Sequence, residues 1–201
     1  MKESGIAWEA IEAKLQKDLT ENRYRHTLGV TYTACALAMA HGEDMEAARL
    51  AGLLHDCAKC ISHKEKLEMC KKSKLEMTEF EQTHPVLLHA ILGAHLARKR
   101  YGVKDENVLS AIRWHTTGRP AMSRLEQIIY IADYIEPNRD KAPRLPDIRE
   151  AAFADLEYCM YLILADTVQY LENKPDAMDR TTVRAYEYYR ELAEEKEEEK
   201  E

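Results

Sequence analysis

The sequence predicts an all-α protein, and two observations carry that prediction. Apolar residues recur at three- and four-residue spacing along almost the whole 201-residue chain, which is the period of amphipathic helices. Glycine and proline are few, at 7 and 6 residues, and most prolines stand near expected helix ends, whereas a β-sandwich needs many turns. An apolar fraction of 45% and a charged fraction of 32% are typical of a globular domain.

The first half of the chain predicts helices over 6–19, 23–39 and 46–57, joined by short connections. Gly42 is a natural helix stop, and Asp44 is a plausible N-cap for the third helix. Residues 62–79 are rich in Lys and Glu with few apolar positions, so we expect a solvated helix and loop there.

The second half opens with a helix that starts at Pro85 and runs to Tyr101. Asp105 caps a helix that ends at His115, and Ser123 begins a strongly apolar helix closed by Pro137. A connection over 138–146, interpreted as a functional loop, leads to two long helices over 148–173 and 178–194. We therefore predict one domain over 1–190, with 191–201 as an acidic helix end or tail.

The net charge of −7 argues against nonspecific binding to nucleic acid or to an anionic membrane. Much of this charge lies in the segment EEKEEEKE that begins at Glu194, so a basic pocket for phosphates remains compatible with the composition. Five cysteines in helical settings, with no signal-peptide core and no membrane-length apolar run, predict reduced thiols and a cytoplasmic protein.

Four acidic and imidazole side chains stand in apolar helical sequence: His26, His55, Asp56 and Asp133. Burying an unpaired carboxylate costs on the order of several kcal/mol, so each Asp needs a partner. A shared cation would supply it, because imidazole nitrogen and carboxylate oxygen suit Fe, Mn, Zn or Ni. Read singly, each His could be a hydrogen-bonded core residue, and each Asp could pair with an arginine such as Arg23 or Arg139.

The order H…HD…D resembles the HD superfamily of metal-dependent phosphohydrolases, an all-α helical bundle. His26, His55, Asp56 and Asp133 fall where that family has its four metal ligands. The resemblance narrows further, because RHTLGV, LAGLLHDCAK, LLHAILGA and above all AIRWHTTGRPAMSRLEQIIYIADYIEPNR are similar to the YqeK-like family. It covers about residues 10–185.

Members of that family are symmetrical diadenosine tetraphosphate hydrolases. The resemblance therefore implies a divalent transition metal, iron above manganese or another ion, and attack of a metal-bound water on a central phosphorus to give two ADP. It implies catalytic roles for Asp56, Lys59, His89 and His115, with His115 as a proton donor to the leaving ADP. The residues implied to contact the nucleotide are Arg23, His26, Lys59, His89, His115, Thr116, Arg139, Asp176, Arg180 and Thr181.

The sequence departs from the family near its C-terminus. Family members often have a His-Pro pair before a Thr and a helix, whereas Met178-Asp179 stand here, which puts the contacts of 176–181 in doubt. Two other functions stay open: an HD nucleotidase or phosphodiesterase for another nucleotide, and a nucleotide-sensing HD protein without catalysis. The expected partners are a dinucleoside polyphosphate and ADP, with no nucleic acid or membrane, and a homodimer is compatible with the C-terminal helices.

Overall fold

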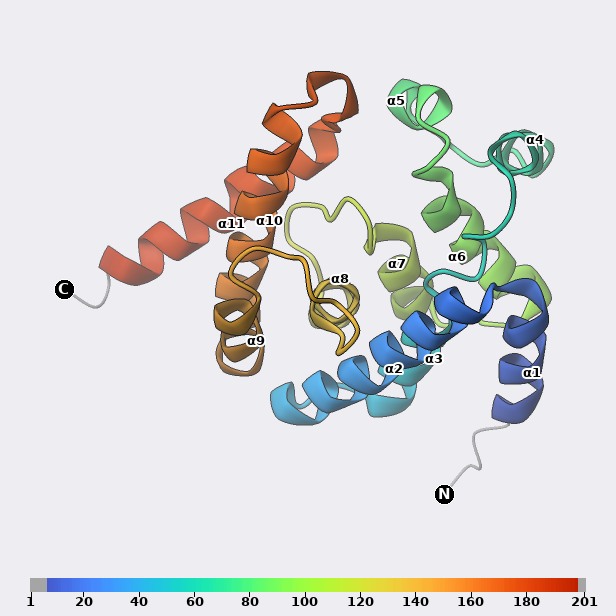
Figure 1. The fold of residues 1–201 in the computed structure, drawn as a ribbon, viewed down its shortest axis with the longest axis horizontal. Helices are drawn as coiled ribbons and strands as arrows, with labels where there is room; N and C mark the ends of the chain where they lie inside the picture. The colour runs from blue at the N-terminus through green and yellow to red at the C-terminus, as the bar shows by residue number, and fades with distance from the viewer. Residues whose placement is uncertain (1–6, 199–201) are drawn as a thin grey trace.

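The computed structural model describes residues 7–198, which form helices and connecting turns with no strand among them (Figure 1). The all-α prediction is confirmed. The helices are α1 (Trp8–Asp18), α2 (Glu21–His41), α3 (Met45–Leu54), α4 (His63–Lys72), α5 (Glu79–Thr83), α6 (Leu88–Arg100), α7 (Glu106–Trp114), α8 (Arg124–Ile135), α9 (Leu145–Ala154), α10 (Leu156–Glu172), the 3₁₀ turn η1 (Pro175–Ala177) and α11 (Arg180–Glu198).

Helix α8 lies at the centre of the molecule. Figure 1 shows it almost end-on, with α2 and α3 below it, α7 on one side and the α9–α10 pair on the other. Every residue from Leu125 to Ala132 is buried, which is the pattern of a helix enclosed on all sides. Ser123 and Glu126 form a capping box that fixes where α8 begins. Asp133 therefore lies near the C-terminal end of α8, directly after the fully buried stretch of the helix.

Helices α2 and α3 form a hairpin whose ends were predicted from the sequence. Gly42 ends α2 in the left-handed conformation, at φ 66°, and Asp44 accepts hydrogen bonds from the first backbone N–H groups of α3. The predicted continuation of α3 to Cys57 is wrong. The helix ends at Leu54, and a tight turn with bonds from Cys57 N to Leu54 O and from Lys59 N to Asp56 O follows.

Two other predicted boundaries are wrong. The helix expected to start at Pro85 begins at Leu88, because 85–87 form a separate turn in which Leu88 N donates to Pro85 O. The helix expected over 148–173 is two helices, α9 and α10, divided at Asp155. That residue has extended backbone angles, φ −149° and ψ 108°, and its carboxylate caps α10.

The C-terminal helix α11 packs on α10 and continues to Glu198, so the proposed domain limit at 190 lies within it. The start of the first predicted helix at Ile6 and the last residues of the acidic segment lie outside the described range. No helix among the described residues is long and apolar enough to span a bilayer.

Candidate metal centre

Six side chains predicted to act together converge from five parts of the fold. The six residues are His26 on α2, His55 and Asp56 in the turn after α3, His89 on α6, His115 at the end of α7 and Asp133 on α8. Three overlapping triplets of them place their ligand atoms within 4.8 Å of one another: His26–His55–Asp56, His55–His115–Asp133 and Asp56–His89–His115. The helical bundle thus brings together residues up to 107 positions apart, as Asp133 and His26 show.

Three of the histidines are oriented by their own backbone. The Nδ1 atoms of His55, His89 and His115 donate to the carbonyl oxygens three residues earlier, at 2.7, 2.6 and 2.7 Å. A carbonyl oxygen only accepts, so Nδ1 carries the proton and a neutral ring presents a lone pair at Nε2. All three Nε2 atoms point into the cluster, in the tautomer that binds a metal or accepts a proton.

His26 is oriented by a buried carboxylate instead. Its Nδ1 donates to Oε1 of Glu136 at 3.0 Å, and Oε2 of Glu136 accepts from the backbone and side-chain nitrogens of Asn138 at 2.7 and 2.8 Å. Glu136 is 1% exposed and lies against Gly29, where a Cβ would be 2.3 Å from Oε2. Carboxylates in this position fix the ring and raise its basicity in metalloproteins.

Glu136, Asn138 and Gly29 lie within the motifs that resemble the family, but none of them was assigned a role from the sequence. An acidic residue at the end of an apolar helix was a weak signal, because such a residue is more often solvated. Only the packing of the end of α8 against α2 reveals its role.

The carboxylate of Asp56 divides its two oxygens between different partners. Oδ2 pairs with Arg23 at 2.7 Å, whereas Oδ1 lies 3.3 Å from His89 Nε2, 3.6 Å from His115 Nε2 and 3.7 Å from Lys59 Nζ. Burial alone raises the pKa of Asp56, but the surrounding imidazoles of His55, His115 and His89 hold that pKa well below its usual range. Asp56 is therefore an anion in the folded protein.

Asp133 also has an arginine partner. Its Oδ1 lies 2.8 Å from Arg139 and 3.0 Å from His26 Nε2. Burial raises the pKa of Asp133, but the nearby imidazoles of His26 and His55 lower it far below the usual range. The arginine pairs considered as an alternative from sequence are thus present, and they leave several ligand atoms of the cluster unpaired.

The unpaired atoms test whether a cation fits. Among the described residues, Nε2 of His26, Nε2 of His55 and Oδ1 of Asp56 are buried and have no hydrogen-bond partner. A buried polar atom without a partner costs about 1–3 kcal/mol, so three at one place indicate a missing ligand. The donors are imidazole nitrogens and carboxylate oxygens, which suit a divalent transition metal. The residues fit such an ion.

A second group of side chains, formed by Lys59, His89, His115 and Thr116, lies beside the four expected ligands on the Oδ1 side of Asp56. Lys59 Nζ lies 3.0 Å from His89 Nε2, and Thr116 Oγ1 lies 3.1 Å from the Nε2 atoms of both His89 and His115. Burial, followed by the positive charge of Lys59, holds the pKa of His89 well below its usual value, so the ring is neutral. This group offers an ammonium and a hydroxyl to an anion.

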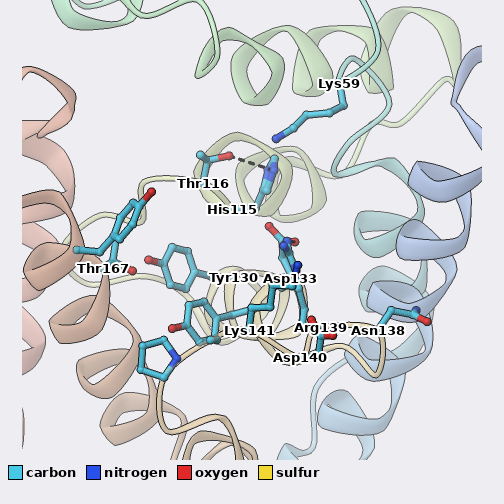
Figure 2. Close-up of a pocket in the computed structure, with 14 residues that line it drawn as sticks. Lys59, His115, Thr116, Tyr130, Asp133, Asn138, Arg139, Asp140, Lys141 and Thr167 are labelled. Atoms are coloured by element: carbon cyan, nitrogen blue, oxygen red, sulfur yellow. Dashed lines mark hydrogen bonds and ion pairs between the residues drawn. The ribbon is translucent and has the colours of Figure 1, made fainter. Parts of the chain in front are cut away.

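A cavity of about 710 Å³ opens beside the cluster, and Figure 2 shows Lys59, His115, Thr116, Asp133 and Arg139 along its wall. The predicted residues near the C-terminus lie elsewhere. Arg180 and Thr181 line a separate cavity of about 630 Å³ between α5 and the start of α11, and Asp176 is exposed on η1 and lines neither cavity. The structure does not bring these three residues into the metal cluster.

The sequence and the fold can be compared with those of known proteins. The model of the HD domain matches residues 23–138, a segment that begins at Arg23 and includes all six cluster residues. The chain belongs to the HD-domain family. This HD protein is 42% identical to a symmetrical bis(5′-nucleosyl)-tetraphosphatase from Halalkalibacterium halodurans, over 84% of this chain and 89% of the relative. A protein of the same description from Bacillus subtilis is 38% identical over 88% of this chain and 94% of the relative.

A solved structure is similar throughout. A crystal structure from Clostridium acetobutylicum, described as a predicted HD superfamily hydrolase involved in NAD metabolism, superposes with a TM-score of 0.89 at 40% identity. It covers 92% of this HD protein and 98% of that chain. The predicted resemblance to the YqeK-like group of HD hydrolases is confirmed.

Proposed function

We propose that this HD protein hydrolyses diadenosine tetraphosphate symmetrically, giving two ADP. The observation that carries the proposal is the convergence of His26, His55, Asp56 and Asp133 beside a cavity lined by cationic and hydroxyl groups. Relatives that cover most of the chain and bear the name of this activity support the same reaction.

HD domains bind divalent metals, and the four expected ligands of this chain are His26, His55, Asp56 and Asp133. Within this proposal the ion is iron. Such an ion supplies Lewis acidity, which activates water and polarises a phosphoryl oxygen. The protein's part is to hold the ion, to fix the ligand tautomers and to arrange donors around the phosphate chain.

The chain's own cations and donors would bind the phosphates. Lys59 lies against the open side of Asp56, and Arg139 reaches the cavity from the segment after α8. Thr116 lies between His89 and His115 and can donate its hydroxyl to a phosphoryl oxygen. Negative charge that develops on the phosphates then meets fixed positive groups.

Two proton roles follow from the same geometry. Asp56 Oδ2, which pairs with Arg23, also lies 3.5 Å from His55 Nε2 and would be the oxygen that ligates the ion, so Oδ1 can orient an attacking water. His115 has its Nδ1–H engaged by Ile112 O, so Nε2 is the atom that would carry a proton to the leaving ADP. Arg23 serves as a phosphate contact only if substrate draws it from Asp56.

The proposal is tested by product analysis on anaerobically purified protein whose metal has been measured by elemental analysis. With diadenosine tetraphosphate and the loaded protein, we expect ADP as the sole nucleotide product. AMP with ATP would contradict symmetrical cleavage. No turnover, together with a metal-dependent rise in thermal stability on nucleotide binding, would favour a nucleotide-sensing protein instead.

A second candidate function is hydrolysis of another dinucleotide, because the similar Clostridium structure is described as involved in NAD metabolism. The same chromatographic assay with NAD and with nucleoside monophosphates separates these possibilities. Faster turnover of NAD than of diadenosine tetraphosphate would identify NAD as the better substrate and contradict the first proposal.

A further inference from the structure

The cavity beside the metal cluster is also lined by three tyrosines, Tyr130, Tyr134 and Tyr170. We propose that this part of the cavity, lined by Tyr134, Thr167 and Tyr170, binds one nucleoside of the substrate, with its base against the Tyr170 ring. The inference rests on the proposed function, because it assigns a binding site to one nucleoside of a substrate whose phosphates lie at the metal.

The cavity is ordered from charged to aromatic. Asp133, His115 and Lys59 line the end at the metal cluster, and Arg139 and Lys141 lie along the segment after α8. Tyr134 lines the cavity from α8, and Thr167 and Tyr170 line it from α10. In Figure 2, Lys59 and His115 stand together, and Thr167 stands on the opposite wall with Tyr130 between them. A nucleotide has the same order, since its phosphates are anionic and its base is an aromatic ring.

The size of the cavity also fits. Its volume of about 710 Å³ falls within the roughly 300–1,000 Å³ of small-molecule sites in proteins. Because the cavity includes side chains of the cluster itself, a nucleoside in it would be joined to the metal end by its own phosphate chain.

Tyr170 is an exposed aromatic residue near the C-terminal end of α10, at the cavity. Its side chain is 61% exposed, although α10 is otherwise an apolar helix with a buried face. Lys174 lies one turn later, with Nζ 4.4 Å from the centre of the ring and 2.5 Å from its hydroxyl oxygen, so the ring is held in place. Aromatic side chains held in this way serve as stacking surfaces for bases.

The segment 138–143, which lines the cavity, is held in place by several arginine contacts. Arg139 pairs with Asp133, and Arg149 on α9 donates to the carbonyl oxygens of Ile135, Glu136 and Arg139. Arg144 pairs with Asp166 on α10, which ties the end of the 138–143 segment to the tyrosine wall. A cavity bounded by such contacts is preformed rather than dependent on closure around the ligand.

The charges that face this region favour an anionic ligand. Lys141 has no ion pair among the described residues and lines the cavity with Arg139, against the single acidic neighbour Asp140 in the same segment. Tyr134 lines the same cavity, and its hydroxyl can donate to a ribose or phosphate oxygen.

The site can be located without relying on turnover. We would irradiate the metal-loaded protein with 2-azidoadenosine diphosphate and identify the modified peptides by mass spectrometry, with unlabelled ADP as competitor. Modification of peptides containing Tyr134 or Tyr170, abolished by ADP, is expected. Modification confined to 78–83 and 178–184, which line the second cavity, would overturn the proposal.

Variants give an independent readout. Tyr170→Ala should raise KM for diadenosine tetraphosphate and the Kd for ADP by about 5- to 150-fold, whereas Tyr170→Phe, which keeps the ring, should stay within about threefold. Tyr32→Ala removes another largely exposed tyrosine, from α2 and outside the cavity, and is the matched control. Equal KM and Kd values in Tyr170→Ala and wild type would overturn the proposal, even if the wild-type protein produces ADP. A wild type that binds and labels as expected but produces no ADP would instead refute the proposed reaction.

Discussion

The metal cluster and the tyrosine-lined end of the cavity both include side chains from α8, yet their residues are held in place in different ways. At the cluster, the histidine rings are fixed by carbonyl groups three residues away or by buried Glu136, and nearly every atom is enclosed. At the other end, the cavity is lined by exposed Tyr170 and by a segment that arginine side chains hold in place. The first arrangement is suited to holding an ion in one geometry, and the second to admitting and releasing a nucleotide.

The contrast predicts that changes at the two ends will separate metal binding from substrate binding. Changes at the cluster should alter metal content, whereas changes in the cavity should alter kinetic constants at constant metal content. Any variant that breaks this division would show that the two ends are coupled.

The largest expected effect comes from Asp56→Ala. It removes a buried anion that faces two histidines and Lys59, and it leaves Arg23 without its partner. We expect the metal to be lost on purification and kcat/KM to fall by about 10³-fold or more, since groups that act as a unit are strongly non-additive. Elemental analysis, circular dichroism and the ADP assay check this. A folded variant with full metal content would contradict the ligand assignment.

The next effect separates an anion-binding cation from a metal ligand. Lys59→Ala should lower kcat by about 10²- to 10³-fold, as for removal of one donor to developing charge, while metal content stays at the wild-type value. Lys59→Arg is the matched variant, because it keeps a cation. Loss of metal from Lys59→Ala would mean that Lys59 supports the cluster rather than the phosphates.

A smaller effect is expected one step away from the ion, at Glu136. Glu136→Ala removes the acceptor of the His26 Nδ1–H and should weaken metal affinity about 10- to 100-fold, as outer carboxylates do elsewhere. Competition with a metal chelator measures this directly. Glu136→Gln keeps an acceptor of similar shape and should lose less affinity.

Gly29→Ala offers a second route to the same change. A Cβ at Gly29 would lie 2.3 Å from Glu136 Oε2, so the carboxylate must move away from its present contacts. A variant with unchanged metal affinity would show that the orientation of His26 does not depend on this carboxylate.

The sequence predicted the cluster better than the cavity, and the physical reason is the range of the contacts. A charged residue in an apolar helix is visible in the sequence, so His26, His55, Asp56 and Asp133 could be selected from the residue pattern alone. Glu136 and Tyr170 have ordinary sequence contexts. Their surroundings are set by helices far away in the chain, which residue patterns along the chain do not encode.

The division of the predicted 148–173 helix at Asp155 shows the same limit. The apolar pattern of α9 continues almost unbroken into α10, so periodicity alone predicts one helix. The competing signal was Asp155 followed by Glu157, a recognisable helix start. In the structure, Asp155 accepts from the backbone nitrogens of Glu157 and Tyr158 and pairs with Lys196 of α11, which explains why the chain turns there.

The smallest predicted effect tests that turn. Asp155→Ala should lower the free energy of unfolding by about 0.5–2 kcal/mol through loss of the cap, whereas Asp155→Asn, which can still cap, should lose less.

Burial raises the pKa of Asp155, but the hydrogen bonds from Lys196 and the Tyr158 N–H lower it below its usual value overall. The contribution of the carboxylate is therefore present above the unfolded pKa of about 3.9 and is lost as pH falls through the folded value. Urea unfolding at pH 7 and near pH 3 measures both variants. An equal stability gap at the two pH values would show that the carboxylate charge adds nothing, while metal content and KM should match wild type throughout, because Asp155 touches neither end of the site.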